Sequence, residues 1–156
     1  MKATNVTRLL DHHKIPYKAF ELPAQKLSAL EAAQYLDVSP ELVYKTIVAL
    51  PSSKPKPVLA LLPATKELDL KALAQALGEK KVNLPTQKEA ERLTGLQAGG
   101  ISPLALLNRN FPTIIDSTAK NHAEIYISAG QRGLNIRLPV DALIELTGAS
   151  IYDIGK

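Results

Sequence analysis

Apolar side chains recur along the chain at two spacings, which predict helices and strands in alternation. Val6, Leu9 and Leu10 share one face at helical spacing, and the predicted helix ends before Pro16. Capping-type residues predict further helices that begin at Ser28 with Glu31, Ser39 before Pro40, Asp69, Thr86 with Glu89, and Pro139 with Asp141. Glycine predicts three of the helix ends, at Gly78, Gly95 and Gly148.

Runs of β-branched and aliphatic residues lie between these helices and predict strands. They cover residues 17–22, 44–50, 58–62, 82–84, 113–116, 124–128 and 134–138, with an extended tail at Ile151 and Ile154. The stretches 51–57 and 129–133 each join two strands as a hairpin. About six or seven strands and about five helices predict an α+β fold, in which helices surround a mixed, largely antiparallel sheet. We interpret residues 1–156 as one domain, because no repeat or linker interrupts them.

The composition narrows the chemistry that this domain can perform. Apolar residues make up 46% and aromatic residues only 4%, so the core is expected to consist of Leu, Ile, Val and Ala. The absence of Cys excludes disulfides, thiolate metal sites and a thiol nucleophile. No apolar run approaches the roughly 20 residues that span a bilayer. The start of the chain lacks the apolar core of a signal peptide, so we expect a cytoplasmic protein that does not engage a membrane.

A formal charge of +4 and a pI near 9.3 fit a polyanionic partner, although many small soluble proteins carry the same charge. We interpret two lysine pairs as solvated surface residues that are also able to contact RNA backbone: Lys54 with Lys56, and Lys80 with Lys81. Charge alone therefore leaves a nucleic-acid partner open.

A glycine-rich segment, residues 94–103, is the most informative stretch for chemistry. Gly99 and Gly100 lack a Cβ, so the backbone can turn tightly and present its amides to a carbonyl oxygen or a phosphate. The segment matches neither the phosphate-binding loop nor the dinucleotide fingerprint. A tight turn without a ligand is the structural alternative.

Two further positions complete a candidate pocket. Lys45 is polar at the start of an otherwise apolar strand, where it is either a surface charge or a cation at the mouth of a cleft. Residues 128–133 place Arg132 between glycines, either as a solvated hairpin turn or as a second wall of the same pocket.

The other candidates carry less chemistry. His12 and His13 are adjacent and point in different directions on a helix, and His122 is isolated, so no metal site is predicted. Ser102 lacks a nucleophile elbow and a local histidine. Asp116 ends a strand, where we expect a structural role that includes capping or orienting the glycine loop.

Three stretches, in order along the chain, carry a family resemblance: residues 43–46, 94–103 and 126–134. Together they resemble the YbaK family of free-standing aminoacyl-tRNA deacylases, which is related to the editing domain of prolyl-tRNA synthetase. The resemblance covers nearly the whole chain and implies the editing-domain fold. It also implies hydrolysis of the ester between an amino acid and the terminal adenosine of tRNA, chiefly in Cys-tRNA(Pro) and also in Cys-tRNA(Cys), without a cofactor.

The resemblance also assigns site residues. The essential lysine of the family falls on Lys45, and its glycine loop falls on Gly95, Gly99, Gly100, Ile101, Ser102 and Pro103. Its second wall falls on Ser128, Gly130 and Gly133, and an aspartate of the family appears here as Asn135. Typical members carry an aromatic residue where this chain has Ser28 or Ala29, and a double glycine where it has Ala129-Gly130. These departures concern the choice of substrate more than the reaction class.

The expected mechanism uses no protein nucleophile. The amides of Gly99 and Gly100 stabilise the oxyanion, and Lys45 holds the terminal adenosine or its phosphate. The thiol of a cysteinyl substrate attacks the ester and forms a thiolactone, with attack by water as the alternative. Two other functions remain open: deacylation of Ala-tRNA(Pro) or another small mischarged amino acid, and a non-catalytic module that binds tRNA ends or a synthetase. The expected partners are the acceptor end of aminoacylated tRNA and, transiently, prolyl-tRNA synthetase.

Overall fold

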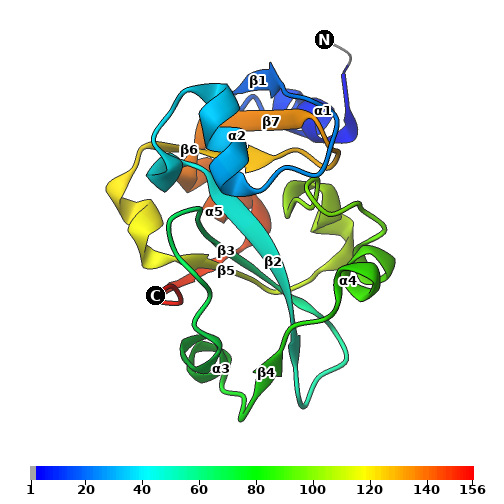
Figure 1. The fold of residues 1–156 in the computed structure, drawn as a ribbon, viewed down its shortest axis with the longest axis vertical. Helices are drawn as coiled ribbons and strands as arrows, with labels where there is room; N and C mark the ends of the chain where they lie inside the picture. Colours follow the sequence, from blue (N-terminus) through cyan, green and yellow to red (C-terminus); the bar gives the residue numbers. More distant parts are fainter. Residues whose placement is uncertain (1–2) are drawn as a thin grey trace.

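A computed structural model describes residues 3–156, in which the strands form two sheets (Figure 1). The first has three antiparallel strands in the order β1 (Lys18–Glu21), β7 (Leu134–Pro139) and β6 (Glu124–Ser128). The second has five strands in the order β4 (Val82–Asn83), β2 (Tyr44–Pro51), β3 (Val58–Pro63), β5 (Thr113–Asp116) and β8 (Ser150–Tyr152). The α+β class with mixed, largely antiparallel pairing is confirmed, whereas the strands divide between two sheets instead of forming one.

Parallel pairing between whole strands occurs on one side of the larger sheet. Strand β3 pairs in parallel with β5, which pairs in parallel with β8, so that Leu61, Ile115 and Ile151 lie side by side. Every residue of β3 is buried, as expected for a strand covered on both faces. The hairpin between β2 and β3 and the hairpin between β6 and β7 form as the sequence predicts.

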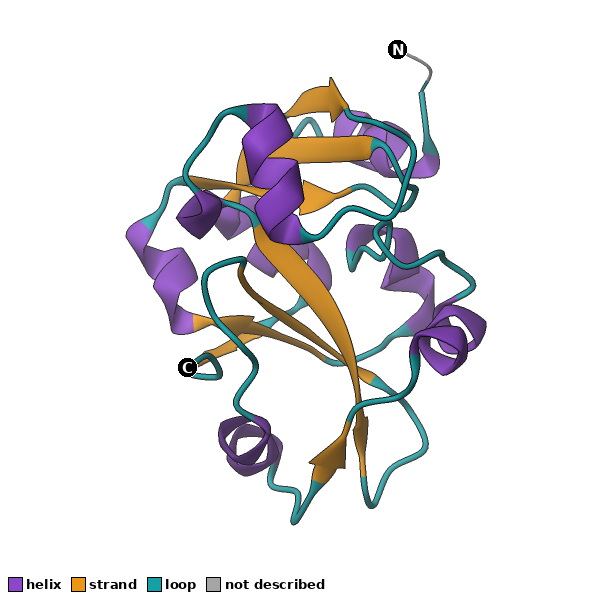
Figure 2. Cartoon of the chain, in the orientation of Figure 1, coloured by secondary structure: helices purple, strands orange, loops and turns teal. Residues whose placement is uncertain are grey.

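Within residues 3–156, five α-helices surround the sheets (Figure 2): α1 (Asn5–His12), α2 (Ala29–Leu36), α3 (Leu70–Leu77), α4 (Gln87–Thr94) and α5 (Val140–Thr147). The predicted capping box of Ser28 and Glu31 is present in full, whereas Thr86 makes only its half of the box predicted before α4. Three 3₁₀-helices add to these: η1 (Pro40–Leu42), η2 (Leu104–Arg109) and η3 (Ser117–Asn121). The helix predicted after Ser39 is therefore a single 3₁₀ turn.

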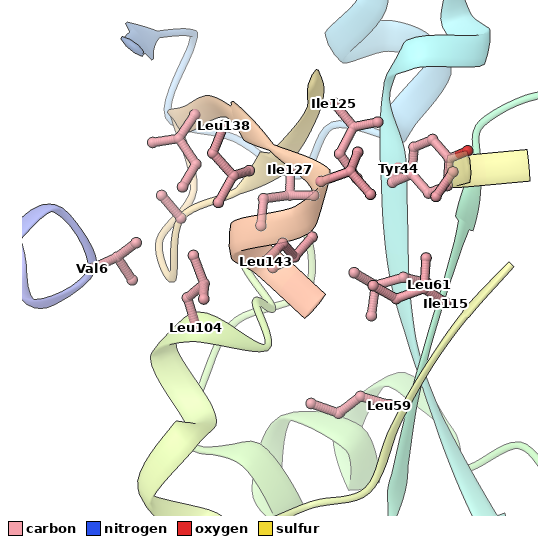
Figure 3. Close-up of a cluster of buried hydrophobic side chains, with 14 of the residues drawn as sticks. Val6, Tyr44, Leu59, Leu61, Leu104, Ile115, Ile125, Ile127, Leu138 and Leu143 are labelled. Atoms are coloured by element: carbon pink, nitrogen blue, oxygen red, sulfur yellow. The ribbon is translucent and has the colours of Figure 1, made fainter. Parts of the chain in front are cut away.

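The main core fills the space between the two sheets. Figure 3 shows Ile125, Ile127 and Leu138 of the small sheet on the side that faces Leu61 and Ile115 of the large sheet. A second cluster lies beneath α3. Aliphatic residues dominate both clusters, as the composition predicts. No helix within residues 3–156 is long and apolar enough to cross a membrane.

One contact between the sheets matters for function. Val43 forms an isolated parallel bridge with Tyr126, so the start of β2 lies against β6. This bridge brings Lys45, two residues further along β2, close to the hairpin that follows β6.

Candidate active site

A hollow of about 260 Å³ opens where four segments meet. These are the start of β2, the segment that leads into α2, the glycine loop 95–103, and the hairpin between β6 and β7. The predicted site residues that line it are Lys45, Gly99, Ile101, Ser128, Gly133 and Asn135. Ser28 and Ala29, which replace the family's aromatic residue, also line it. The fold thus brings all three sequence stretches to one place.

Lys45 supplies the cation of the hollow. It pairs with Leu62 across the sheet and is partly buried. Burial lowers the pKa of its ammonium group below the usual 10.5, and the charge of Glu67 opposes this shift. No salt bridge joins Lys45 to a carboxylate within residues 3–156. A half-buried cation without an ion-pair partner is suited to an anionic or strongly polar ligand.

The two central glycines of the loop have different roles. The N–H of Gly100 donates to the carbonyl of Gln97 at 2.9 Å, which closes the turn and engages this amide. A Cβ on Gly100 would lie 2.7 Å from the carbonyl carbon of Gln131, so glycine allows the loop and the hairpin to approach closely. The Gly99 N–H, in contrast, has no acceptor in the described part of the chain. Gly99 therefore offers the amide that the expected mechanism assigned to both glycines.

Side chains around the loop hold its peptide units in place. The Glu91 carboxylate accepts a hydrogen bond from the Ala98 N–H at 2.7 Å, and the Arg132 Nε donates to the Ala98 carbonyl at 2.7 Å. The Ser128 hydroxyl donates to the Gly99 carbonyl at 3.0 Å. Glu91 carried no signal in the sequence, because it is an ordinary helical glutamate until the loop folds against it.

The remaining predicted residues lie behind the lining. Gly95 is the left-handed cap of α4, and Pro103 is the N-cap of η2. Ser102 is fully buried, and its hydroxyl accepts a hydrogen bond from the Leu104 N–H at 3.2 Å, so it is not exposed as a nucleophile. Gly130 has a φ of 93° and packs near Ala105. These positions shape the loop and the hairpin.

Asn135 is a polar residue buried in the wall of the hollow. It is 6% exposed, and its Oδ1 has no hydrogen-bond donor within residues 3–156. Buried polar atoms are normally paired, so an unpaired one beside a hollow indicates capacity to bind a ligand. Asn135 thus has the surroundings expected of the substrate-binding role predicted for it.

Asp116 has a structural environment. Its carboxylate accepts hydrogen bonds from Thr118 and from the N–H groups of Ile154 and Gly155, and none from the glycine loop. Burial raises the pKa of this carboxyl, but the hydrogen bonds together hold the pKa below the usual 3.8. The expected structural role thus fits, but at the C-terminal segment instead of the glycine loop. No cluster of three or more metal-binding side chains occurs in residues 3–156.

The sequence and the fold are similar to those of known proteins. The profile of the aminoacyl-tRNA editing domain matches residues 24–146. A protein of Enterococcus faecalis, EbsC, is 38% identical over 153 residues, which cover 97% of this chain and 92% of EbsC. Its name provisionally assigns it Cys-tRNA(Pro)/Cys-tRNA(Cys) deacylase activity.

Solved structures with the same fold are also known. A crystal structure described, also provisionally, as a trans-editing enzyme for prolyl tRNA synthetase has a TM-score of 0.82 and 25% identity. The match covers 100% of this chain and 99% of that one. The hypothetical protein APE2540 has a TM-score of 0.88 at 23% identity, over 98% of this chain and 100% of its own, and shows the fold. The chain belongs to the aminoacyl-tRNA editing domain family. Its class of activity is aminoacyl-tRNA deacylation, as the sequence predicts, and its substrate is an aminoacylated tRNA.

Proposed function

We propose that the chain removes cysteine from Cys-tRNA(Pro), and also from Cys-tRNA(Cys), in the hollow around Lys45. The observation that carries the proposal is the presence of two complementary groups in one hollow: the unpaired Lys45 ammonium and the Gly99 backbone. The first suits the phosphate or ribose of the terminal adenosine, and the second suits an acyl oxygen. The name of the E. faecalis relative supports the choice of cysteine.

The proposed reaction starts with attack of the cysteinyl thiol on the ester carbonyl. A sulfur–carbon bond forms, the thiol loses its proton, and the carbonyl oxygen becomes an oxyanion next to the Gly99 N–H. Collapse of the oxyanion breaks the bond to the ribose oxygen, which takes up a proton and leaves as free tRNA. Water then opens the small thiolactone to cysteine. Loss of one oxyanion donor costs about 3–4 kcal/mol, so a single well-oriented amide makes a large contribution.

Lys45 and Asn135 have positioning roles in this proposal. The Lys45 ammonium holds the adenosine end so that the thiol and the carbonyl carbon are at reacting distance. The Asn135 amide binds a polar group of the aminoacyl ester. Because the substrate supplies the nucleophile, Ser102 need not be exposed, and serine or alanine esters lack the attacking group.

The choice of tRNA is proposed to lie partly outside this chain. The hollow is large enough for an acyl group and part of the terminal nucleoside. Different tRNAs share this nucleoside, so the hollow alone does not distinguish them. Transient association with prolyl-tRNA synthetase would supply selectivity for tRNA(Pro), and the proposed site of action is the cytoplasm, where that synthetase charges tRNA.

A panel of charged tRNAs tests the proposal. We expect rapid release of the amino acid from Cys-tRNA(Pro) and Cys-tRNA(Cys), and slow release from Ala-tRNA(Pro) and Pro-tRNA(Pro). A preference for Ala-tRNA(Pro) would show that the amino acid removed is alanine and not cysteine. Protection of every ester would indicate a non-catalytic binding module. Trapping of a thiolactone supports the thiol route, whereas free cysteine without a trapped ring supports attack by water.

A further inference from the structure

Four exposed lysines from two separate segments meet at the end of β2 that lies away from the hollow. Lys54 and Lys56 lie in the loop between β2 and β3, and Lys80 and Lys81 lie between α3 and β4. The β2–β4 pairing joins the two segments, and the Ser52 N–H donates to the Lys81 carbonyl at 3.1 Å. We call these four residues the lysine patch. In Figure 1 the patch region is the lower end of the molecule, where β4 lies against β2.

The Glu79 carboxylate lies in this region and is hydrogen-bonded to the loop between β2 and β3. Glu79 accepts hydrogen bonds from the Ser53 N–H at 2.9 Å and from the Ser53 hydroxyl at 2.6 Å. These bonds lower the pKa of Glu79, so it stays ionised and fastens the Lys54–Lys56 loop to the segment that carries Lys80. Four lysines against one glutamate leave three positive charges, and no salt bridge within residues 3–156 involves the four lysines.

The surface beside Lys54 and Lys56 is concave. These two lysines line a hollow of about 350 Å³ together with Glu79 and the apolar residues Pro51, Pro55, Val58, Leu77 and Pro112. Glu79 is already hydrogen-bonded to Ser53, so the hollow has an apolar floor with two unpaired cations at its rim, which is complementary to a sugar–phosphate backbone that presents ribose carbons between phosphates. The charge and the shape of this surface therefore both fit RNA.

The distance from the active-site hollow determines how large a shared ligand must be. Strand β2 carries Lys45 near its start and ends at Pro51, a separation of roughly 20 Å at the usual rise of a strand. This distance is longer than one nucleoside, and it corresponds to roughly six phosphates along one strand of a duplex. A nucleic acid that reaches both places is therefore longer than the aminoacylated nucleoside alone.

We propose that the lysine patch binds the phosphate backbone of the tRNA acceptor stem while the aminoacylated 3′ end occupies the hollow around Lys45. The inference rests on the proposed function for the position of the 3′ end. Contacts to phosphate are independent of base sequence, so the patch provides affinity for tRNA without choosing among tRNAs. Sequence-independent binding by the patch agrees with the proposal that prolyl-tRNA synthetase supplies the selectivity for tRNA(Pro).

Two substrates separate the patch from the hollow: full-length Cys-tRNA(Pro) and a short 3′-cysteinylated CCA oligonucleotide that lacks the stem. Two double variants, Lys54→Ala/Lys56→Ala and Lys80→Ala/Lys81→Ala, each remove two charges. We expect each to lower kcat/KM on tRNA by about tenfold and to reduce the salt dependence of tRNA binding by a slope of about two. Hydrolysis of the short substrate is expected to stay within about twofold of wild type, because it cannot reach the patch.

Lys18→Ala/Lys120→Ala is the matched control, because it removes two exposed lysines from β1 and η3. Patch variants that match this control on tRNA, in rate and in salt dependence, would overturn the inference, as would an equal loss on both substrates. Fluorescence anisotropy with uncharged tRNA(Pro) tests the patch separately from catalysis. If wild type hydrolysed neither ester, the proposed function would fail, whereas weaker tRNA binding by the patch variants would still support the patch.

Discussion

The Arg132 side chain holds the carbonyl of Ala98 with a hydrogen bond of 2.7 Å. The carbonyl and the N–H of a trans peptide point in opposite directions, so this bond fixes the direction of the Gly99 N–H. The next peptide is held at both ends, because the Gly99 carbonyl accepts from Ser128 and the Gly100 N–H donates to Gln97. The Gly99 amide is therefore unengaged and held in a fixed orientation, as an oxyanion donor requires.

Replacement of Arg132 tests this orientation. We expect Arg132→Ala to lower kcat by at least about tenfold with little change in KM, because misplacement of a catalytic group by 1 Å costs up to about 10²-fold. Single-turnover deacylation measures the effect. Arg109→Ala is the control, since Arg109 also donates to a backbone carbonyl, that of Leu93, which lies in α4 outside the glycine loop. An equal loss in both variants would remove Arg132 from this role.

Alanine substitutions at two glycines of the loop, Gly100 and Gly95, are expected to differ in their effect on activity. A Cβ on Gly100 would meet the Gln131 backbone at 2.7 Å, so Gly100→Ala should separate the loop from the hairpin, abolish activity and cost about 1–3 kcal/mol. Gly95 has a φ of 73° and nothing within 4 Å of its Cβ position. Gly95→Ala should therefore cost about 1–2 kcal/mol of backbone strain and keep activity. Loss of activity in stable Gly95→Ala would give Gly95 a direct role.

Lys45 should leave a signature in the pH dependence of stability. Its folded pKa lies below 10.5, so between the folded pKa and 10.5 the unfolded chain binds more protons and the lysine's unfavourable contribution diminishes as pH rises. We expect Lys45→Met to be at least as stable as wild type at neutral pH. The stability of wild type relative to the variant should increase as pH rises through that interval. Urea unfolding at several pH values measures the difference, and a constant difference would contradict a desolvated ammonium.

Asp116 is expected to affect stability and not chemistry. Its carboxylate accepts from two N–H groups of the C-terminal segment, so Asp116→Asn should cost about 2 kcal/mol at neutral pH while turnover of the folded variant stays near normal. Because its folded pKa is lowered below 3.8, this stability is present above 3.8 and is lost as pH falls through the folded value. A folded Asp116→Asn variant without activity would place Asp116 in the reaction.

Local signals account for most of the elements that the sequence predicts. Ser28 with Glu31 and Asp69 fix helix starts through side-chain hydrogen bonds between neighbours, and Gly78 supplies a left-handed end. The parallel pairing of β3, β5 and β8 and the division into two sheets depend on contacts between distant segments, which periodicity does not encode. The short helices η2 and η3 were missed, because one or two 3₁₀ turns leave no 3.6-residue pattern.

The same distinction applies to the site. Lys45 and the glycine loop stand out locally, since one is a charge in an apolar strand and the other a cluster of glycines. The engaged amide of Gly100 and the bond from Glu91 to Ala98 arise only from the folded loop. For the same reason, the sequence predicts two separate lysine pairs that are solvated or contact RNA, and only the β2–β4 pairing in the fold brings them together.

Single-turnover deacylation of Cys-tRNA(Pro) by wild type and Lys45→Ala, with Lys120→Ala as the control for loss of a lysine, tests most directly whether the hollow holds the ester. The expected result is rapid release of cysteine by wild type and by the control, and a rate at least about 10²-fold lower for a folded Lys45→Ala, because its ester is no longer positioned. A folded Lys45→Ala that releases cysteine at the rate of wild type would contradict the account.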